Sequence, residues 1–121
     1  MGAKPLTADY APDAGDLIWT DFDPRVGREQ SGRRPALVIS PRALWDASRF
    51  AIVCPITARI RPWSSSAVLP PGLPITGEVL TSHVRSIDTL ARPVRPVGAS
   101  ISAELLEDVR ARLASLLGIE P

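Results

Sequence analysis

The segment between residues 23 and 34 concentrates side chains that can bind an anion and act on it. Its candidate groups are four arginines, one of its two carboxylates and an amide: Arg25, Arg28, Glu29, Gln30, Arg33 and Arg34. Gly27 and Gly32 supply hinges in a stretch that joins two apolar runs, so we expect a loop between two strands. Guanidinium groups form paired hydrogen bonds with phosphate oxygens, and a nearby carboxylate can accept a proton. The residue types therefore favour an anion site on this loop.

A second cationic stretch follows the third apolar run of the chain. Arg59, Arg61 and Trp63 combine positive charge with an aromatic surface, a pairing expected for single-stranded nucleic acid. Trp63 is equally compatible with the core or with a dimer contact, and Trp19 and Trp45 fit those places better. We expect the loops at 23–34 and 58–66 to form one groove.

Several kinds of enzyme site are excluded by the composition. His83 is the only histidine and Cys54 the only cysteine, so the chain has no zinc cluster, no two-histidine nuclease site and no disulfide framework. It also lacks a glycine-rich phosphate loop that leads into a helix. We expect no metal, no cofactor and a buried thiol at Cys54. What remains is a phosphodiester site of arginine, carboxylate and hydroxyl groups. RNA allows such a site because its own 2′-hydroxyl can attack the adjacent phosphate.

The net charge of +1 hides a strongly cationic middle. Residues 25–95 hold eleven arginines against four acidic residues, a net +7, whereas residues 1–24 carry −4 and residues 96–121 carry −2. Thirteen of the 14 basic residues are arginine, which suits a nucleic-acid surface. Codon bias explains an arginine-rich composition equally well, so composition alone leaves both interpretations open.

The length of 121 residues fits one compact domain, at a size where small β-domains often gain stability by dimerising. An apolar fraction of 45% and a charged fraction of 22% are ordinary for a globular protein. No apolar run reaches the length of a membrane span or a secretory core. We therefore expect a cytoplasmic protein without membrane contact.

The apolar pattern predicts short strands followed by one helix. The expected strands are 15–22, 35–40, 50–56, 67–69, 77–81 and 83–87, the last two either separate or one bent strand. Thr57 follows the third strand directly, a helical turn is expected at 42–47, and Pro93 and Pro96 are expected to end the sheet. Ser102 is a good N-cap for a helix over about 102–117. Residues 1–14 are expected to form a flexible arm before a single domain at 15–118.

This order of elements indicates a mostly β fold with a C-terminal helix, a small SH3-like barrel on which the helix forms a lid. Periodicity alone does not distinguish such a barrel from an open α+β sandwich.

Three motifs follow one another in the first half of the chain: GDLIW, then DFDP, then G-x-EQ-x-G-x-RPALVISP. In this order they resemble the opening half of the MazF/PemK family of toxin ribonucleases, and the resemblance extends over about residues 13–118. Residues 82–88 resemble the family stretch D-Q-[IVL]-[RK]-[ST]-[IV]-D, except that Ser82 and His83 replace the usual Asp-Gln pair. The resemblance implies the barrel that this family shares with its CcdB relatives, and homodimers formed through it.

The resemblance also implies catalytic roles. The family's catalytic arginine, in the Arg-Pro step that begins the second strand, falls on Arg34, and its catalytic threonine falls on Thr57. Arg34 would stabilise developing charge and Thr57 would orient the scissile phosphate. The proton for the leaving 5′-oxygen could come from Arg34, from water or from Glu29. Glu29 matches the family's loop glutamate, as a base toward the 2′-hydroxyl or as a partner that holds Arg34. The residues alone also allow Arg34 to pair with Asp16 or Asp21. Thr57 could bond its own backbone, and Glu29 could be a solvated carboxylate.

Other cationic and polar side chains are expected to bind RNA around the scissile phosphate. They are Arg25, Arg28, Gln30, Arg33, Arg59, Arg61, Trp63, His83 and Arg85. His83 is also open to interpretation as an acid or base foreign to the family, or as a polar strand residue.

The function implied by the resemblance is a sequence-specific, metal-independent endoribonuclease toxin, an mRNA interferase of a type II toxin–antitoxin system. It would cut single-stranded RNA to leave 2′,3′-cyclic phosphate and 5′-hydroxyl ends. A MazE-like antitoxin, with an acidic tail in the cationic groove, would inhibit it. Two alternatives stay open: a CcdB-like toxin that binds gyrase without catalysis, and an RNA-binding barrel without turnover.

Overall fold

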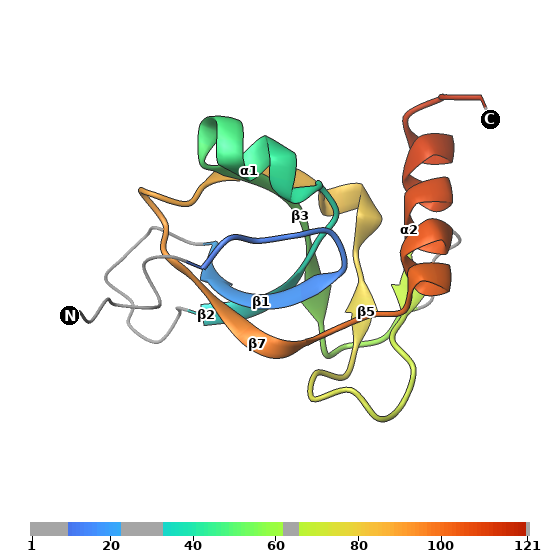
Figure 1. The fold of residues 1–121 in the computed structure, drawn as a ribbon. Helices are drawn as coiled ribbons and strands as arrows, with labels where there is room; N and C mark the ends of the chain where they lie inside the picture. The colour runs from blue at the N-terminus through green and yellow to red at the C-terminus, as the bar shows by residue number, and fades with distance from the viewer. Residues whose placement is uncertain (1–9, 23–32, 62–65, 121) are drawn as a thin grey trace.

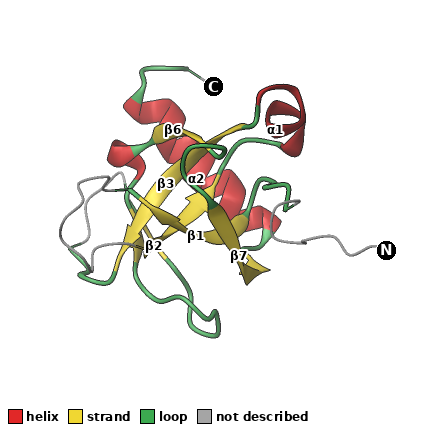
Figure 2. Ribbon diagram, turned by 90° about the vertical axis from the view of Figure 1, so that its left-hand side faces the viewer, coloured by secondary structure: helices red, strands yellow, loops and turns green. Residues whose placement is uncertain are grey.

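The computed structural model describes residues 10–22, 33–61 and 66–120, which form a curved antiparallel sheet with one long helix beside it (Figure 1). The elements in chain order are β1 (Asp16–Asp21), β2 (Arg33–Val38), α1 (Arg42–Ser48), β3 (Phe50–Thr57), β4 (Ala67–Val68), β5 (Glu78–Val79), the 3₁₀ turn η2 (Thr81–His83), β6 (Arg85–Asp88), β7 (Val94–Ser100) and α2 (Ala103–Leu116). Figure 2 shows α2 crossing behind the strands, with α1 apart from it at one end.

The sheet is organised around β3, because three strands pair with it along its length. β6 pairs with its first four residues, β2 with its middle and β5 with its last two. The strand order is β4-β5-β3-β2-β1-β7, with β6 off this path. Among the described residues no pairing joins β6 to β7, so the sheet is curved but not closed into a complete barrel. The expected class, mostly β with a C-terminal helix, is confirmed.

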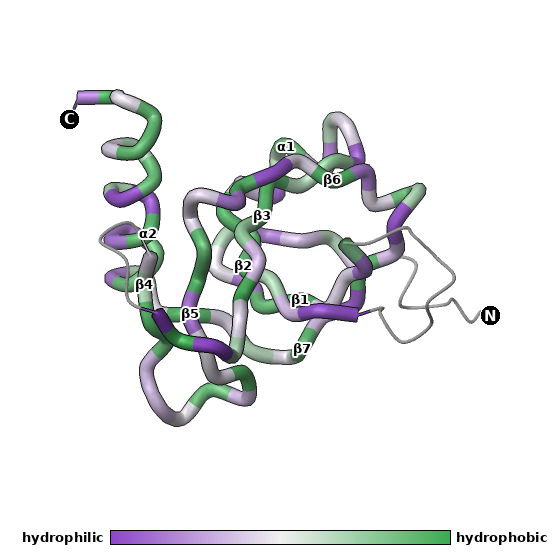
Figure 3. The backbone as a smooth tube through the Cα atoms, turned by 180° about the vertical axis from the view of Figure 1, so that it is seen from behind, coloured by the Kyte–Doolittle hydropathy of each residue, from purple (hydrophilic) through white to green (hydrophobic). Residues whose placement is uncertain are grey.

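Both faces of the sheet are buried. Leu17 and Leu37 belong to the core that α2 covers, whereas their neighbours Ile18 and Ala36 belong to the core on the other face. Successive side chains of a strand point to opposite faces, so β1 and β2 contribute to both cores. Val109 is the fully buried residue of α2. Figure 3 shows the result, with apolar stretches along the central strands and alternating polar and apolar residues along α2.

The C-terminal helix begins where the sequence predicted. Ser102 is its N-cap, and the Ser102 hydroxyl oxygen accepts the backbone N–H of Leu105 at 3.1 Å. The helical turn expected at 42–47 is α1, and the expected first, third and fourth strands appear as β1, β3 and β4. β2 begins two residues earlier than predicted, at Arg33, which places Arg34 inside the strand.

The prediction that Pro93 and Pro96 end the sheet was wrong. β7 runs through Pro96 and pairs with β1, where Pro96 lies opposite Ile18. β7 stands at one end of the strand order. Proline has no backbone N–H to donate, and an edge strand tolerates it because only one side of that strand pairs with a neighbour. Local sequence does not reveal which strand will lie at an edge.

The region from Gly77 to Ile87 contains two separate strands, which was one of the two predictions, but it differs at the junction between them. β5 and β6 are separate strands that pair with different parts of β3. The turn η2 lies between them, so His83 is not a strand residue. This turn carries His83 to the end of β3, where it lies near Thr57 in the hollows described below.

The expected flexible arm, residues 1–14, lies mostly outside the described residues. Of the part that is described, Tyr10 donates its hydroxyl to Asp16 at 2.5 Å, and Asp13 accepts the backbone N–H of Arg42 at 2.9 Å. Within the described ranges, none of the helices has the length and apolar character needed to span a membrane.

Candidate active site

Arg34 and Thr57 are brought together by the antiparallel register of β2 and β3. The ladder pairs Ala36 with Pro55. Continued by two residues along each strand, the same register sets Arg34 opposite Thr57, and side chains two residues apart share a face. The ladder between β2 and β3 ends at Ala36 and Pro55, so Arg34 and Thr57 lie just beyond its last pair.

Two adjoining hollows occupy this end of the sheet. The first, about 520 Å³, is lined by Phe22, Arg34, Pro55, Ile56, Thr57, Leu80, His83 and Arg85. The second, about 540 Å³, is lined by Thr57, Arg59, Arg61, Ser66, Glu78, Leu80, Ser82 and His83. The two hollows share Thr57, Leu80 and His83, and we call them together the Thr57 groove. The groove thus joins residues from β2, β3, β5, η2 and β6.

The Thr57 hydroxyl has a fixed partner on one side. Its oxygen accepts the backbone N–H of Arg59 at 3.2 Å. A bond from the Thr57 hydroxyl to nearby backbone was one of the two roles that the sequence allowed for this residue. A hydroxyl has one hydrogen to donate as well as two lone pairs. The bond to Arg59 therefore orients the oxygen and leaves the hydroxyl hydrogen able to reach an anion in the groove.

The register tests the alternative partners of Arg34. Arg34 lies opposite Thr20 in the β1–β2 ladder, and Asp21 lies opposite Arg33. Asp16 is four residues from Thr20 along β1, about 13 Å, which is beyond the reach of the Arg34 side chain. The Asp16 carboxylate instead accepts the hydroxyl of Tyr10. An ion pair between Arg34 and Asp16 is thereby excluded.

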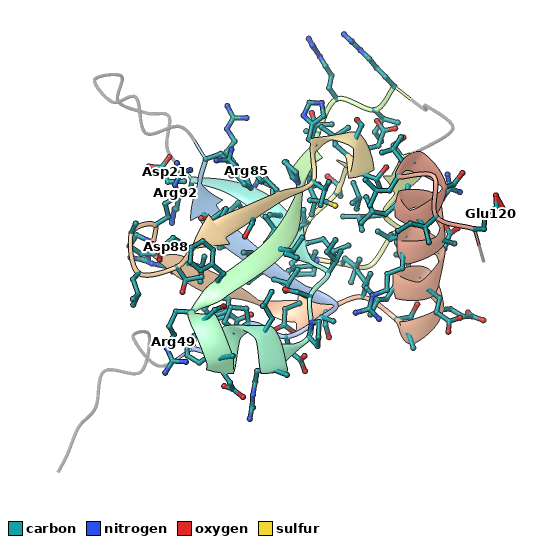
Figure 4. The ribbon with its side chains drawn as sticks, turned by 90° about the horizontal axis from the view of Figure 1, so that it is seen from above. Asp21, Arg49, Arg85, Asp88, Arg92 and Glu120 are labelled. Atoms are coloured by element: carbon teal, nitrogen blue, oxygen red, sulfur yellow. The ribbon has the colours of Figure 1, made fainter. Side chains whose placement is uncertain are left out.

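Other arginines at this end pack on aromatic rings. The Arg33 guanidinium lies 5.8 Å from the ring centre of Trp19, and that of Arg85 lies 5.1 Å from Phe22. Both distances suit a cation–π contact. Arg92 donates to the backbone oxygens of Asp21 and Phe22, 3.2 Å from each, and so holds the end of β1 (Figure 4).

Some of the expected site residues cannot be placed. Arg25, Arg28, Glu29, Gln30 and Trp63 lie outside the described residues, and their roles remain predictions. Of the others, Arg34, Thr57, Arg59, Arg61, His83 and Arg85 all line the Thr57 groove. Arg33 is exposed at the start of β2, on the ring of Trp19.

Phe22, Ser66 and Glu78 are among the groove residues that were not expected from the sequence. Phe22 stands in the DFDP motif beside the arginine loop. Glu78 is a charged residue in an otherwise apolar strand and is fully buried, which is uncommon for glutamate. Its place inside a strand was the signal that could have marked it.

Cys54 lies in the core under α2 and has no exposed surface, which confirms the expected buried thiol. Burial raises the pKa of Cys54 from 9.0 to about 12, so the thiol stays protonated at neutral pH. Within the described ranges, no group of three or more His, Cys, Asp or Glu side chains is placed to hold a metal ion.

Comparison with known proteins shows which family the chain belongs to. The family model of the PemK-like, MazF-like toxin of type II toxin–antitoxin systems matches residues 13–117. The endoribonuclease toxin MazF of Escherichia coli K12 is 35% identical over 113 residues, which cover 93% of this chain and all of that protein. The chain therefore belongs to the PemK-like, MazF-like toxin family.

Solved structures agree with this assignment. The crystal structure of MazF from Deinococcus radiodurans superimposes with a TM-score of 0.81 at 43% identity, over 92% of this chain and 100% of that one. A MazE–MazF crystal structure from the same organism gives a TM-score of 0.80 at 39% identity, over 93% and 100% of the two chains. The second of these relatives is thus a toxin bound to its MazE partner.

Proposed function

We propose that this chain is a metal-independent endoribonuclease toxin that cuts single-stranded RNA at a short sequence. The observation that carries the proposal is the placement of Arg34 and Thr57 in one groove, in a chain whose relatives are named endoribonucleases. A guanidinium and a hydroxyl are the groups that a phosphodiester transfer needs when RNA supplies its own nucleophile.

In the proposed reaction the RNA 2′-oxygen attacks the adjacent phosphorus. The 2′-hydroxyl gives its proton to a base, for which Glu29 is our candidate, and the bond from phosphorus to the 5′-oxygen breaks. The 5′-oxygen leaves with a proton, and the products are a 2′,3′-cyclic phosphate and a 5′-hydroxyl. Arg34 stabilises the charge that develops on the phosphate oxygens, while Thr57 donates its hydroxyl hydrogen to one of them.

Arg34 does not supply the proton in this scheme. Arginine side chains in proteins keep their protons, so an arginine is a poor general acid. A water molecule or protonated Glu29 is the proposed donor to the leaving 5′-oxygen.

The RNA strand would run along the Thr57 groove. Arg59, Arg61 and Arg85 line it and His83 lies between its two hollows, so these side chains suit the phosphates and bases beside the scissile bond. Arg33 extends the cationic surface. We propose the same binding role for Arg25, Arg28, Gln30 and Trp63.

Two protein partners belong to the proposal. MazF of Deinococcus radiodurans forms a complex with MazE, and we propose a MazE-like antitoxin for this chain. It would cover the groove, where charge favours an acidic segment. The active form would be a homodimer in the cytoplasm, where its RNA substrate is found. The relatives reported above give the gyrase-binding alternative no support.

The test is incubation of the purified, antitoxin-free chain with long single-stranded RNA in EDTA, followed by mapping of the product ends. Site-specific cuts with cyclic-phosphate ends are expected for the wild type and are expected to vanish in Arg34→Ala. Intact RNA after incubation with a folded wild-type chain would contradict the proposal. Two alternatives would then remain: a protein that binds RNA without cutting it, and a toxin that binds gyrase. A gyrase pull-down then chooses between those two.

A further inference from the structure

Glu78 is a fully buried carboxylate beside the proposed catalytic threonine. It has no exposed surface, and the β3–β5 ladder sets it opposite Thr57. A buried carboxylate is costly unless hydrogen bonds satisfy it. Because Glu78 needs these hydrogen bonds, it also holds the groups that donate them in place.

Two of these bonds come from residues on either side of the segment 62–65. One Glu78 oxygen, Oε1, accepts the backbone N–H of Arg61 at 2.8 Å, and the other, Oε2, accepts the Ser66 hydroxyl. Ser66 is itself buried. Arg61 and Ser66 line the same hollow as Thr57, so a single side chain holds two points of the groove wall.

Helix α2 holds Ser66 from the opposite direction. Nη1 of Arg112 donates to the Ser66 carbonyl oxygen at 2.7 Å. Nε of the same guanidinium donates to both carboxylate oxygens of Asp108, at 3.1 and 3.2 Å. The groove wall at Ser66 is therefore fixed between Glu78 on the sheet and Arg112 on the helix.

The proposed catalytic pair depends on different contacts. Arg34 is placed by the pairing of β2 with β1, and Thr57 by the end of β3 and by its bond from the Arg59 N–H. Loss of the Glu78 side chain leaves these backbone contacts in place. The effect of the Arg34–Thr57 pair can therefore be measured separately from the effect of the groove wall that Glu78 holds.

We propose that Glu78 is a positioning residue for RNA binding: it holds Arg61 and Ser66 so that the cationic wall of the Thr57 groove is in place before RNA arrives. The inference rests on the proposed nuclease function. A wall that is already ordered loses less conformational entropy on binding, so its effect falls on substrate affinity. The chemical step, which depends on Arg34 and Thr57, is expected to be little changed.

The experiment measures kcat and KM for cleavage of a single-stranded RNA whose cut sites have been mapped with the wild type. Glu78→Val removes the hydrogen bonds from Arg61 and Ser66 at similar volume, and we expect KM to rise about tenfold with kcat within about twofold. Glu78→Gln is expected to keep KM within about threefold, because its amide oxygen can accept the Arg61 N–H and Ser66 can accept from its amide nitrogen. Ser66→Ala removes the bond from Ser66 but keeps the one from the Arg61 N–H, and is expected to give an intermediate KM. Glu107→Gln, an exposed carboxylate on α2, controls for the loss of one negative charge.

The outcomes separate the two proposals. A wild type that cuts no RNA contradicts the nuclease function itself. If the wild type cuts RNA and a folded Glu78→Val has the wild-type KM, or loses kcat at unchanged KM, only the positioning role is overturned. Equal losses in Glu78→Gln and Glu78→Val overturn it as well, since they point to charge rather than to hydrogen bonds. Should Glu78→Val fail to fold, an unchanged KM in Ser66→Ala overturns the proposal on its own.

Discussion

Thr57 and Glu78 are cross-strand partners at the end of β3, and both line the same hollow. Residues directly opposite each other in an antiparallel ladder share a face of the sheet. One of the pair is a partly exposed hydroxyl, and the other is a carboxylate with no exposed surface. The group proposed for chemistry and the group proposed to support it therefore come from a single rung of the sheet.

Thr57 is expected to act through its hydroxyl hydrogen. Thr57→Val keeps the shape but removes a hydrogen bond to a charged phosphate, which is worth about 1.5–3 kcal/mol, or roughly 13- to 160-fold in kcat. Thr57→Ser keeps the hydroxyl and is expected to stay within about threefold of the wild type. Single-turnover RNA cleavage measures both variants beside Arg34→Ala, which we expect to be the more severe. Equal activity of the Val and Ser variants would remove the hydroxyl from the mechanism.

Gly77 is required by a close backbone approach beside Thr57. Its φ is +139°, and a Cβ added there would lie 2.2 Å from the Thr57 carbonyl oxygen. Gly77→Ala is expected to lower the free energy of unfolding by at least about 3 kcal/mol, because strain and a backbone clash act together. Gly72 is the matched control, since its φ is +98° but nothing lies within 4 Å of an added Cβ. Gly72→Ala should cost only about 1–2 kcal/mol in urea unfolding, and equal losses would refute the clash.

The N-cap of α2 gives a test of the helix boundary. Ser102→Ala removes the acceptor of the Leu105 N–H and is expected to cost about 1 kcal/mol of stability. Ser115→Ala is the control, because Ser115 is an exposed residue in the last turn of the same helix, where alanine is a better helix former. Thermal or urea unfolding compares the two. A loss in Ser115→Ala as large as that in Ser102→Ala would argue against the cap.

The buried thiol of Cys54 is expected to make the free energy of unfolding depend on pH in alkaline solution. Because burial raises the pKa of the folded thiol from 9.0 to about 12, the unfolded chain releases this proton at lower pH than the folded chain does. The Cys54 contribution is therefore complete below pH 9 and is lost as pH rises, by about 1.4 kcal/mol per pH unit between 9 and the folded value. Urea unfolding at pH 8, 9 and 10 measures this slope.

The matched variant for this slope is Cys54→Ala, which is expected to be less stable at pH 8 but to lose less stability between pH 9 and 10. Tyr10 acts in the same direction at higher pH, since burial and its hydrogen bond to Asp16 raise the pKa of its hydroxyl. The comparison is therefore confined to pH 10 and below. Identical slopes in the wild type and Cys54→Ala would contradict the assignment.

The sequence by itself determined the elements whose signals are local. Alternating residues marked β1, a continuous apolar run marked β3, and the helical spacing after Ser102 marked α2, because such patterns depend on residues a few positions apart. The arginines and Thr57 were found by residue type and by motif order. These features need no knowledge of which segments of the chain meet.

The tertiary structure decided what depends on partners distant in sequence. Pro96 lies in β7 because β7 is an edge strand, and His83 reaches the Thr57 groove because η2 bends the chain between two strands that pair with β3. Glu78 became a buried support because residues on both sides of segment 62–65 donate to it. Strand order, groove shape and the satisfaction of buried charge are set by long-range pairing, which a local pattern of residues does not encode.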